Sequence, residues 1–234
     1  MIVGIYAEGR ADQAVITNIL KGALNIDRSD LRYELPEYHL DQTDLHTMPV
    51  EQHSSWTVVK KVCEERRLID TFFDNPIVQE SFIVIQIDTA ERHLVGYNVT
   101  EPVKSKENDP EEYCLELRVN VIDKINGWLE NSHQDKIAYA VAIEEIDAWV
   151  LTIYDSKTAD TSGYSNPKEK LSNEINRVFS NNSRRDLNNK KAFEKYDVLS
   201  QDFRKKKKLA VCMTKNESLK LFCESLAIFK SDEE

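Results

Sequence analysis

Residues 82–88, Phe-Ile-Val-Ile-Gln-Ile-Asp, restrict the possible folds of this chain more than any other segment. Apolar residues occur on both faces of the strand that this run predicts, and Asp88 ends it. A strand that is apolar on both faces is typical of a parallel sheet covered by helices, because an antiparallel strand usually leaves one face in water. The run therefore predicts a central strand of an α/β protein.

Strand patterns and helix patterns alternate along the first two thirds of the chain. Ile2–Tyr6 and Ile137–Ile143 are runs that predict two more strands, and Arg32–Tyr38 is a candidate for a fourth. Apolar residues at helical spacing mark helices at 11–23, 56–73, 110–129 and 146–153. This alternation predicts an α/β fold with a mainly parallel sheet flanked by helices.

The last third of the chain contains helix patterns alone. Asn166 and Pro167 form a good N-cap and first-turn pair for a helix that continues to Phe179. Apolar residues from Leu219 to Phe229 mark a final helix. We therefore expect an α/β domain over residues 1–155 and a helical C-terminal extension over residues 156–234, packed on the sheet.

The composition favours a soluble cytoplasmic protein. The 234 residues include 31 Lys+Arg and 41 Asp+Glu, a formal net charge of -10, and 41% are hydrophobic, enough to fill a core. No apolar stretch approaches the roughly 20 residues that span a bilayer, and no basic-then-apolar leader opens the chain. The four cysteines lie far apart, which favours free thiols in a reducing compartment. We expect no contact with a membrane.

Acidic side chains follow three of the predicted strands. They are Glu8 and Asp12 after the first strand, Asp88 and Glu91 after the central strand, and Glu144, Glu145 and Asp147 after the strand at 137–143. The carboxyl ends of parallel strands meet at one edge, with neighbouring strands about 4.8 Å apart, so these carboxylates should lie together. Such a cluster needs a counter-charge, which Mg²⁺ or Mn²⁺ supplies. Two such ions are a known arrangement for phosphodiester cleavage.

Each of these acids also has a purely structural explanation. Asp12 is favoured at a helix N-terminus, Asp88 can cap the turn after its strand, and residues 144–147 can form a solvated first helical turn. Their joint occurrence after three strands favours a shared site over three separate structural roles. The sequence lacks a phosphate-binding P-loop, a dinucleotide-binding Gly-x-Gly-x-x-Gly turn and a nucleophile elbow, so no competing site is visible.

Two of these segments resemble the Toprim fold, a metal-binding α/β fold shared by topoisomerases, primases and OLD-type nucleases. They are residues 6–12, Tyr-Ala-Glu-Gly-Arg-Ala-Asp, and residues 85–88, Ile-Gln-Ile-Asp. Three later segments are similar to a small bacterial branch related to the OLD nucleases and called RloG-like: 145–151, 166–171 and 216–222. The resemblance spans most of the chain through short motifs.

The resemblance implies a nuclease with a site for Mg²⁺ or Mn²⁺. It makes Glu8, Asp12 and Asp88 metal-site residues, joined by Glu145 and Asp147. Glu8 is also implied as a general acid or base, acting with Asp88 in catalysis. The family is often encoded beside ABC-type ATPases in phage-defence loci, which implies an ABC-type ATPase partner and an effector role.

The chain departs from the family at one acidic position. Toprim proteins usually carry Asp-x-Asp, whereas Ala90 here occupies the second acidic position and Glu91 follows it. Glu91 is longer and one residue later, so it can reach the same ion with a different geometry. Because of this departure, two alternatives to an intact two-metal site remain: a site for one metal ion, and a degenerate module that has no catalytic activity.

A basic tract lies at residues 184–208, with ten Lys/Arg against four Asp/Glu. A chain of net charge -10 needs such local positive charge to contact phosphates, although a solvated face is an equal alternative. Lys195 is a candidate catalytic residue that stabilises a phosphorane-like transition state. The candidate nucleic-acid-binding residues are Arg184, Arg185, Lys190, Lys191, Arg204, Lys205, Lys206, Lys207 and Lys208.

These features support three hypotheses about function. The first is a metal-dependent nuclease that cleaves DNA or RNA phosphodiesters in bacterial anti-phage defence. The second is a catalytically degenerate Toprim-like module that binds a partner ATPase or nucleic acid, and the third is a phosphotransferase or phosphatase acting on a small nucleotide. Metal binding separates the first from the second, and cleavage of a polymer separates the first from the third.

Overall fold

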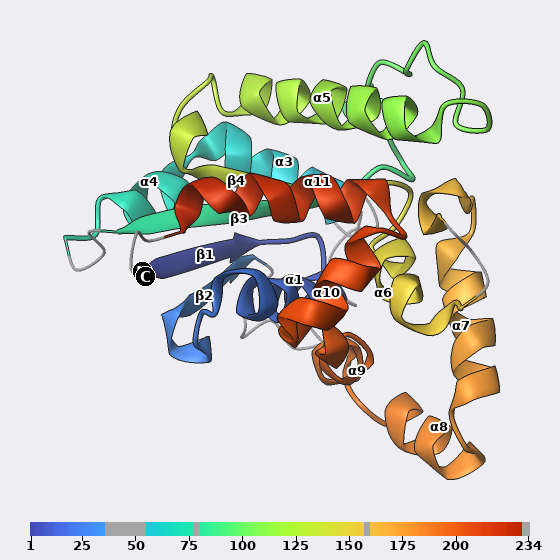
Figure 1. Ribbon diagram of the computed structural model, residues 1–234. Coiled ribbons are helices and arrows are strands. Elements are labelled where there is room, and N and C mark those ends of the chain that lie inside the picture. The colour runs from blue at the N-terminus through green and yellow to red at the C-terminus, as the bar shows by residue number, and fades with distance from the viewer. Residues whose placement is uncertain (36–54, 77–79, 157–159, 231–234) are drawn as a thin grey trace.

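The computed structural model describes residues 1–35, 55–76, 80–156 and 160–230 (Figure 1). In this part of the chain the strands β1 (Ile2–Tyr6), β2 (Leu31–Leu35), β3 (Ser81–Asp88) and β4 (Ile137–Ala142) form one sheet in the order β2-β1-β3-β4. All of its neighbouring strands are parallel. The predicted α/β fold is therefore confirmed. Residues 36–38 of the strand predicted at 32–38 lie outside the described residues.

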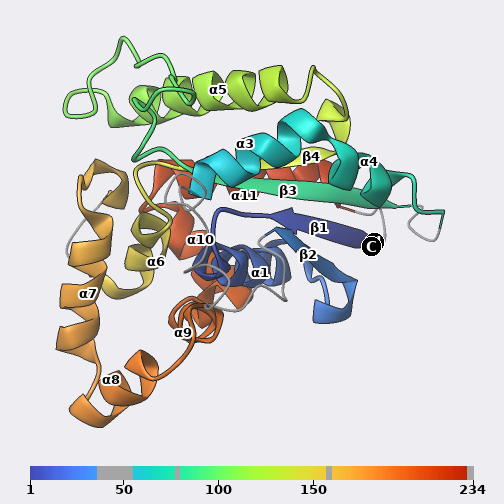
Figure 2. The ribbon, with the colours of Figure 1, turned by 180° about the vertical axis from the view of Figure 1, so that it is seen from behind.

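Helices cover both faces of the sheet (Figures 1 and 2). Alternate residues of β3 point into two cores, with Phe82 and Val84 in one and Ile83 and Ile85 in the other. The first core is covered by helices α1 (Arg10–Leu24), α6 (Asp147–Tyr154) and α11 (Glu217–Ser225). The second core is covered by helices α3 (Ser55–Glu65), α4 (Arg67–Phe73) and α5 (Pro110–Trp128). Within the described residues, no helix is long and apolar enough to span a membrane.

The single helix predicted over residues 56–73 is instead two helices, α3 and α4, which meet at Arg66. Arg66 has a left-handed backbone with φ 55°, and this conformation ends α3. Its N–H donates to the carbonyl of Val62 at 2.9 Å, and its own carbonyl accepts from the N–H of Asp70 at 2.8 Å. Cys63 and Ile69 nevertheless share one core, which is why the apolar spacing alone predicts a continuous helix.

The C-terminal helices complete the core that α1 and α6 cover. Trp149 of α6 stacks on Phe222 of α11 with ring centroids 5.5 Å apart, and its indole N–H donates to Ser218 Oγ at 2.7 Å. Helix α9 (Ala192–Leu199) packs against α1, and α11 packs against β4. The predicted helical extension therefore shares its core with the sheet.

The extension contains four helices besides α11, together with three short 3₁₀ turns. They are α7 (Pro167–Val178), α8 (Asn181–Asn188), α9 (Ala192–Leu199), α10 (Lys206–Met213), η4 (Thr161–Gly163), η5 (Gln201–Arg204) and η6 (Leu226–Phe229).

Gly22 of α1 marks the closest approach of the C-terminal segment to α1. A Cβ at Gly22 would lie 1.9 Å from the carbonyl oxygen of Phe203 in η5, a backbone atom that cannot rotate away. We expect Gly22→Ala to lower the free energy of unfolding by roughly 1–3 kcal/mol, measured by chemical denaturation. Gly127→Ala in α5 is the matched control, because a Cβ there meets nothing within 4 Å. It should stabilise by up to about 1 kcal/mol, and equal effects of the two changes would contradict this packing.

Candidate functional site

The carboxyl ends of β1, β3 and β4 bring five acidic side chains to one edge of the sheet. Glu8 follows β1, Asp12 lies in the first turn of α1, and Asp88 ends β3. Glu145 precedes α6, and Asp147 lies in its first turn. The charges of the other four all raise the pKa of Asp88, so these five residues, the acidic cluster, act on one another.

Gln86 connects the ends of β1 and β3 within the acidic cluster. Its side-chain oxygen accepts from the N–H of Glu8 at 3.0 Å, and its side-chain nitrogen donates to Oδ1 of Asp88 at 2.8 Å. The N–H of Asp88 in turn donates to Oε1 of Glu8 at 2.8 Å. Gln86 is fully buried and is not among the predicted site residues, although a polar residue inside an apolar strand is itself an indication of such a role.

Burial and mutual repulsion make the acidic cluster hard to ionise. Burial raises the pKa of Asp12 well above its ordinary value, and the charges of Glu8 and Asp147 raise it further. Hydrogen bonds from the backbone amides of Gly9 and Asp12 oppose this rise without cancelling it. Burial is also the main cause of the raised pKa of Asp88, followed by the charge of Asp12. Such a cluster holds protons or binds a cation.

The C-terminal extension contributes polar groups to the acidic cluster. Tyr196 of α9 donates its hydroxyl to Oδ1 of Asp147 at 2.6 Å. Burial raises the pKa of Asp147, whereas this hydrogen bond and the charges of Lys168 and Lys195 lower it. Lys168 likewise opposes the burial that raises the pKa of Glu145. The charge of the predicted residue Lys195 therefore reaches the cluster; the contributions of Lys168 and the Tyr196 hydroxyl are not predicted, because they depend on tertiary contacts.

A cleft of about 120 Å³ lies beside the acidic cluster. Trp56 of α3 forms part of its wall and stacks on Tyr97 with ring centroids 5.2 Å apart. Trp56 is 5% exposed, and its indole N–H has no hydrogen-bond partner among the described residues. Trp56 is not among the predicted site residues, because a tryptophan on the apolar face of a helix indicates a core position. The cleft is lined by Glu8, Trp56, Asp88, Ala90, Glu91 and Glu145.

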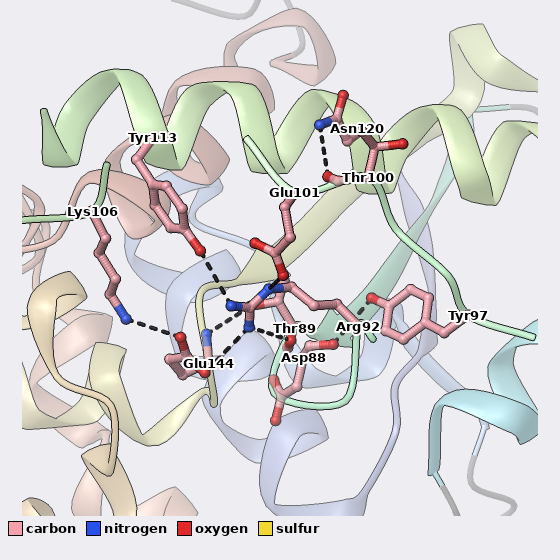
Figure 3. A network of polar contacts seen from close by, with 10 residues as sticks. All are labelled: Asp88, Thr89, Arg92, Tyr97, Thr100, Glu101, Lys106, Tyr113, Asn120 and Glu144. Atoms are coloured by element: carbon pink, nitrogen blue, oxygen red, sulfur yellow. Dashed lines mark hydrogen bonds and ion pairs between the residues drawn. The ribbon is translucent and has the colours of Figure 1, made fainter. Parts of the chain in front are cut away.

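Glu144 belongs to a neighbouring polar network (Figure 3). Its carboxylate pairs with Lys106 at 2.9 Å and with Arg92 at 3.5 Å, and its N–H donates to Thr89 Oγ1 at 2.8 Å. Arg92 also pairs with Glu101 at 2.8 Å. Glu144 has a left-handed backbone with φ 62°, which is strained for a residue other than glycine. The network fixes the turns that follow β3 and β4, next to the acidic cluster.

The donor chemistry of the acidic cluster fits a hard divalent cation, but its side chains are not arranged as a coordination site. Carboxylate oxygens are the ligands that Mg²⁺ and Mn²⁺ prefer. Across the described residues, however, no group of three or more His, Cys, Asp or Glu side chains is placed to hold a metal ion. Oε1 of Glu8 accepts the N–H of Asp88, and Oδ1 of Asp147 accepts the hydroxyl of Tyr196. The expected convergence of Glu8, Asp12 and Asp88 on one ion is therefore not confirmed.

Four of the nine predicted nucleic-acid-binding residues make contacts within the protein. Arg204 pairs with Asp197 at 2.5 Å, and Lys205 and Lys208 both pair with Asp202. The guanidinium of Arg184 donates to the carbonyl of Asn176, and that of Arg204 also donates to the side chain of Asn18. Arg204, Lys205 and Lys208 are exposed despite these ion pairs. The other five predicted nucleic-acid-binding residues are exposed and form no ion pair with the described residues: Arg185, Lys190, Lys191, Lys206 and Lys207.

Comparison of the chain with protein-family models, with curated proteins and with solved structures finds no match. The Toprim resemblance therefore stays a prediction from the motifs. Support for a function comes from the fold, the acidic cluster and the cleft beside it.

The raised pKa of Asp88 predicts a pH dependence of stability in metal-free buffer. The folded state keeps a proton on Asp88 above the ordinary pKa of 3.8, where the unfolded chain has released it, so ionisation at rising pH destabilises the fold. Asp88→Asn removes this cost and keeps an oxygen that can accept from Gln86. As the pH rises above about 4, its stability relative to wild type should increase by up to about 1.4 kcal/mol per pH unit over which the folded wild type holds the proton.

Thermal unfolding in EDTA at a series of rising pH values measures the difference. Asp123→Asn, at an exposed position of α5, is the control and should give a constant difference from wild type. A stability advantage of Asp88→Asn that shrinks with rising pH would contradict the repulsion within the acidic cluster.

Proposed function

We propose that the chain is a nuclease dependent on Mg²⁺ or Mn²⁺ that cleaves DNA or RNA phosphodiesters as the effector of a bacterial anti-phage defence system. The observation that carries the proposal is the acidic cluster, in which Asp12 is 8% and Asp147 is 7% exposed. Carboxylates at this density need bound protons or cations. Open α/β sheets place ligand sites at the carboxyl edge of the strands, where this cluster and its cleft lie.

The acidic cluster supplies the residues that would hold the cation. Glu8, Asp12 and Asp88 would bind it with Glu145 and Asp147, after Glu8 turns away from the N–H of Asp88. Bound Mg²⁺ or Mn²⁺ supplies an activated water and neutralises the leaving oxygen of a phosphodiester. Glu8 lines the cleft and is half-buried, so its carboxylate can also accept a proton there.

Donors around the cleft suit the substrate of such a reaction. The charges of Lys168 and Lys195 reach Asp147, so both cations can offset the negative charge that develops on a transferred phosphate. The unsatisfied N–H of Trp56 costs about 1–3 kcal/mol in the free protein, and a small movement of the cleft wall would let a substrate oxygen satisfy it. Glu91 lines the cleft and is exposed. It could therefore supply the second acid that Toprim proteins usually carry and that Ala90 lacks here.

A second candidate function is a catalytically degenerate module that binds an ABC-type ATPase or nucleic acid. Ala90 lines the cleft at the position where Toprim proteins usually carry an acid. Within the described residues, no three or more His, Cys, Asp or Glu side chains are grouped so that they could hold a metal ion. In such a module, bound protons and the nearby lysines offset the negative charge of the acidic cluster. Calorimetric titration with Mn²⁺ separates the two candidates, because only the nuclease requires the cation.

Glu8→Gln tests the nuclease directly. Glutamine keeps an oxygen that can accept the N–H of Asp88 but removes one charge that raises the pKa of Asp88. The fold should persist, and metal-free stability should be unchanged or higher. Cleavage of plasmid, single-stranded DNA or total RNA with Mn²⁺ should fall by roughly 100-fold or more, and the stabilisation by Mn²⁺ should shrink. Melting curves and cleavage assays measure both effects.

Glu65→Gln, at an exposed position of α3, is the matched control and should cleave like wild type. EDTA should abolish cleavage by the wild-type protein. Equal cleavage by Glu8→Gln and wild type would remove the acidic cluster from the reaction. Hydrolysis of mononucleotides without cleavage of polymers would favour the small-nucleotide phosphatase instead.

Lys206 and Lys207 should contribute affinity for nucleic acid through their exposed charge. Replacing both with Ala should reduce the slope of log affinity against log salt by up to about 2, because fewer counterions are released on binding. The double change Lys205→Ala with Lys208→Ala is the control, and it should alter the slope less because both residues pair with Asp202. Binding is measured by fluorescence anisotropy of a labelled oligonucleotide at several salt concentrations. An unchanged slope in both variants would make the tract a solvated face.

A further inference from the structure

The aromatic wall of the cleft contains a hydrogen-bond donor that the described residues leave unsatisfied. Trp56 is 5% exposed, and its indole N–H has no partner among them. The ring stacks on Tyr97 at 5.2 Å, and the Tyr97 hydroxyl donates to the carbonyl of Asp88 at 3.1 Å. The wall is thus joined to the end of β3, where the acidic cluster lies. A buried donor without an acceptor is rare and indicates a ligand or another functional role.

The other groups that line the cleft define the chemistry of a matching ligand. Glu8, Asp88, Glu91 and Glu145 line it, and ionised carboxylates accept hydrogen bonds and repel phosphate. An arginine or lysine side chain would suit the carboxylates, but it has no acceptor for the N–H of Trp56. The matching ligand therefore presents donors and an acceptor together, without a negative charge.

The edge of a nucleobase with an exocyclic amino group has this pattern. The amino group supplies two N–H donors to carboxylates, and the base offers acceptor atoms as well. Thymine and uracil suit the cleft less, because the single ring N–H of each is flanked by two carbonyl oxygens that carboxylates repel. The lining of the cleft therefore favours cytosine and adenine.

The size of the cleft also suits a base. Its volume of about 120 Å³ is close to the roughly 150 Å³ of an engineered cavity that holds one benzene molecule. Ala90 contributes only a methyl group to the lining and leaves room that a longer side chain would fill. The cleft thus admits one flat ring, while the phosphate of the same nucleotide stays outside the ring of carboxylates.

We propose that the cleft binds one unpaired nucleobase with an exocyclic amino group, which accepts from the N–H of Trp56 and donates to Glu145. The N–H lies beneath the surface of the wall, so the indole turns slightly toward the cleft as the base enters. This inference rests on the proposed function and names its substrate as single-stranded nucleic acid, because pairing in a duplex hides the base edges.

The test is fluorescence anisotropy of short labelled homopolymers of dC, dA and dT with the full chain in EDTA. Wild type should bind dC and dA at least about 5-fold more tightly than dT, and a duplex of dA with dT should bind no more tightly than dT. Trp56→Phe keeps an aromatic ring without the N–H, so it should weaken binding of dC and dA about 2- to 10-fold and leave dT unchanged. Ala90→Leu fills the cleft and should abolish the preference.

Trp128→Phe is the matched control. Trp128 is 8% exposed and also contacts the ring of Tyr97, at 5.9 Å, but it is not one of the residues that line the cleft. Its variant should bind all three homopolymers like wild type, and melting curves check that every variant is folded. An equal loss in Trp128→Phe and Trp56→Phe would assign the effect to core packing and overturn the inference.

The remaining outcomes separate this inference from the proposed function. Equal affinity of wild type for the three homopolymers, or no binding of any of them, would overturn the inference. Cleavage with Mn²⁺ is assayed separately: a preference for dC and dA in EDTA without any cleavage would overturn the nuclease and support the base-binding cleft. Cleavage by a protein that shows no base preference would support the nuclease and overturn the base-binding cleft.

Discussion

The burial of negative charge at one edge of the sheet is the constraint on which the rest of the structure depends. The parallel strands direct Glu8 and Asp88 to the same edge, and α1 and α6 begin there with Asp12 and Asp147 in their first turns. The positive ends of these two helix dipoles stabilise the carboxylates. They do not suffice, because the pKa values of Asp12 and Asp88 stay raised through burial and repulsion. The C-terminal extension supplies further compensation, because the Tyr196 hydroxyl and the charges of Lys168 and Lys195 lower the pKa of Asp147.

Features set by local periodicity could be predicted from the sequence, and features set by distant contacts could not. The apolar run at 82–88 predicts β3, and parallel topology then predicts that acids after different strands meet at one edge. The left-handed Arg66 that separates α3 from α4 lies inside an unbroken apolar pattern. The wall formed by Trp56 and the bond from Tyr196 to Asp147 depend on pairs of segments far apart in the chain.

The basic tract illustrates how a charge count differs from available charge. Ten Lys/Arg in residues 184–208 predict a strongly basic surface. In the fold, Asp202 pairs with both Lys205 and Lys208, and Arg204 pairs with Asp197. The spacing of Asp202 and Lys205 on the sequence already permits such a pair. Attraction of a polyanion therefore depends on the cations that these two aspartates leave unpaired, and the salt dependence of binding measures their number better than a count of charges in the sequence does.

The contacts of α1 determine the order in which the chain can fold during synthesis. Asn18 accepts from the Arg204 side chain at 2.6 Å, across 186 residues of sequence. Contacts of such separation form late, whereas local elements form early. All described strands are complete at residue 142, yet the sheet face that α11 covers stays open until residues 217–225 have emerged. A nascent chain therefore displays an apolar sheet face until α11 has emerged. The residues that line the cleft are all present once Glu145 has been made. A chain terminated after α6 therefore has the lining of the cleft and the core on the other face of the sheet, but it lacks the C-terminal helices of the first core and the Tyr196 hydroxyl that contacts Asp147.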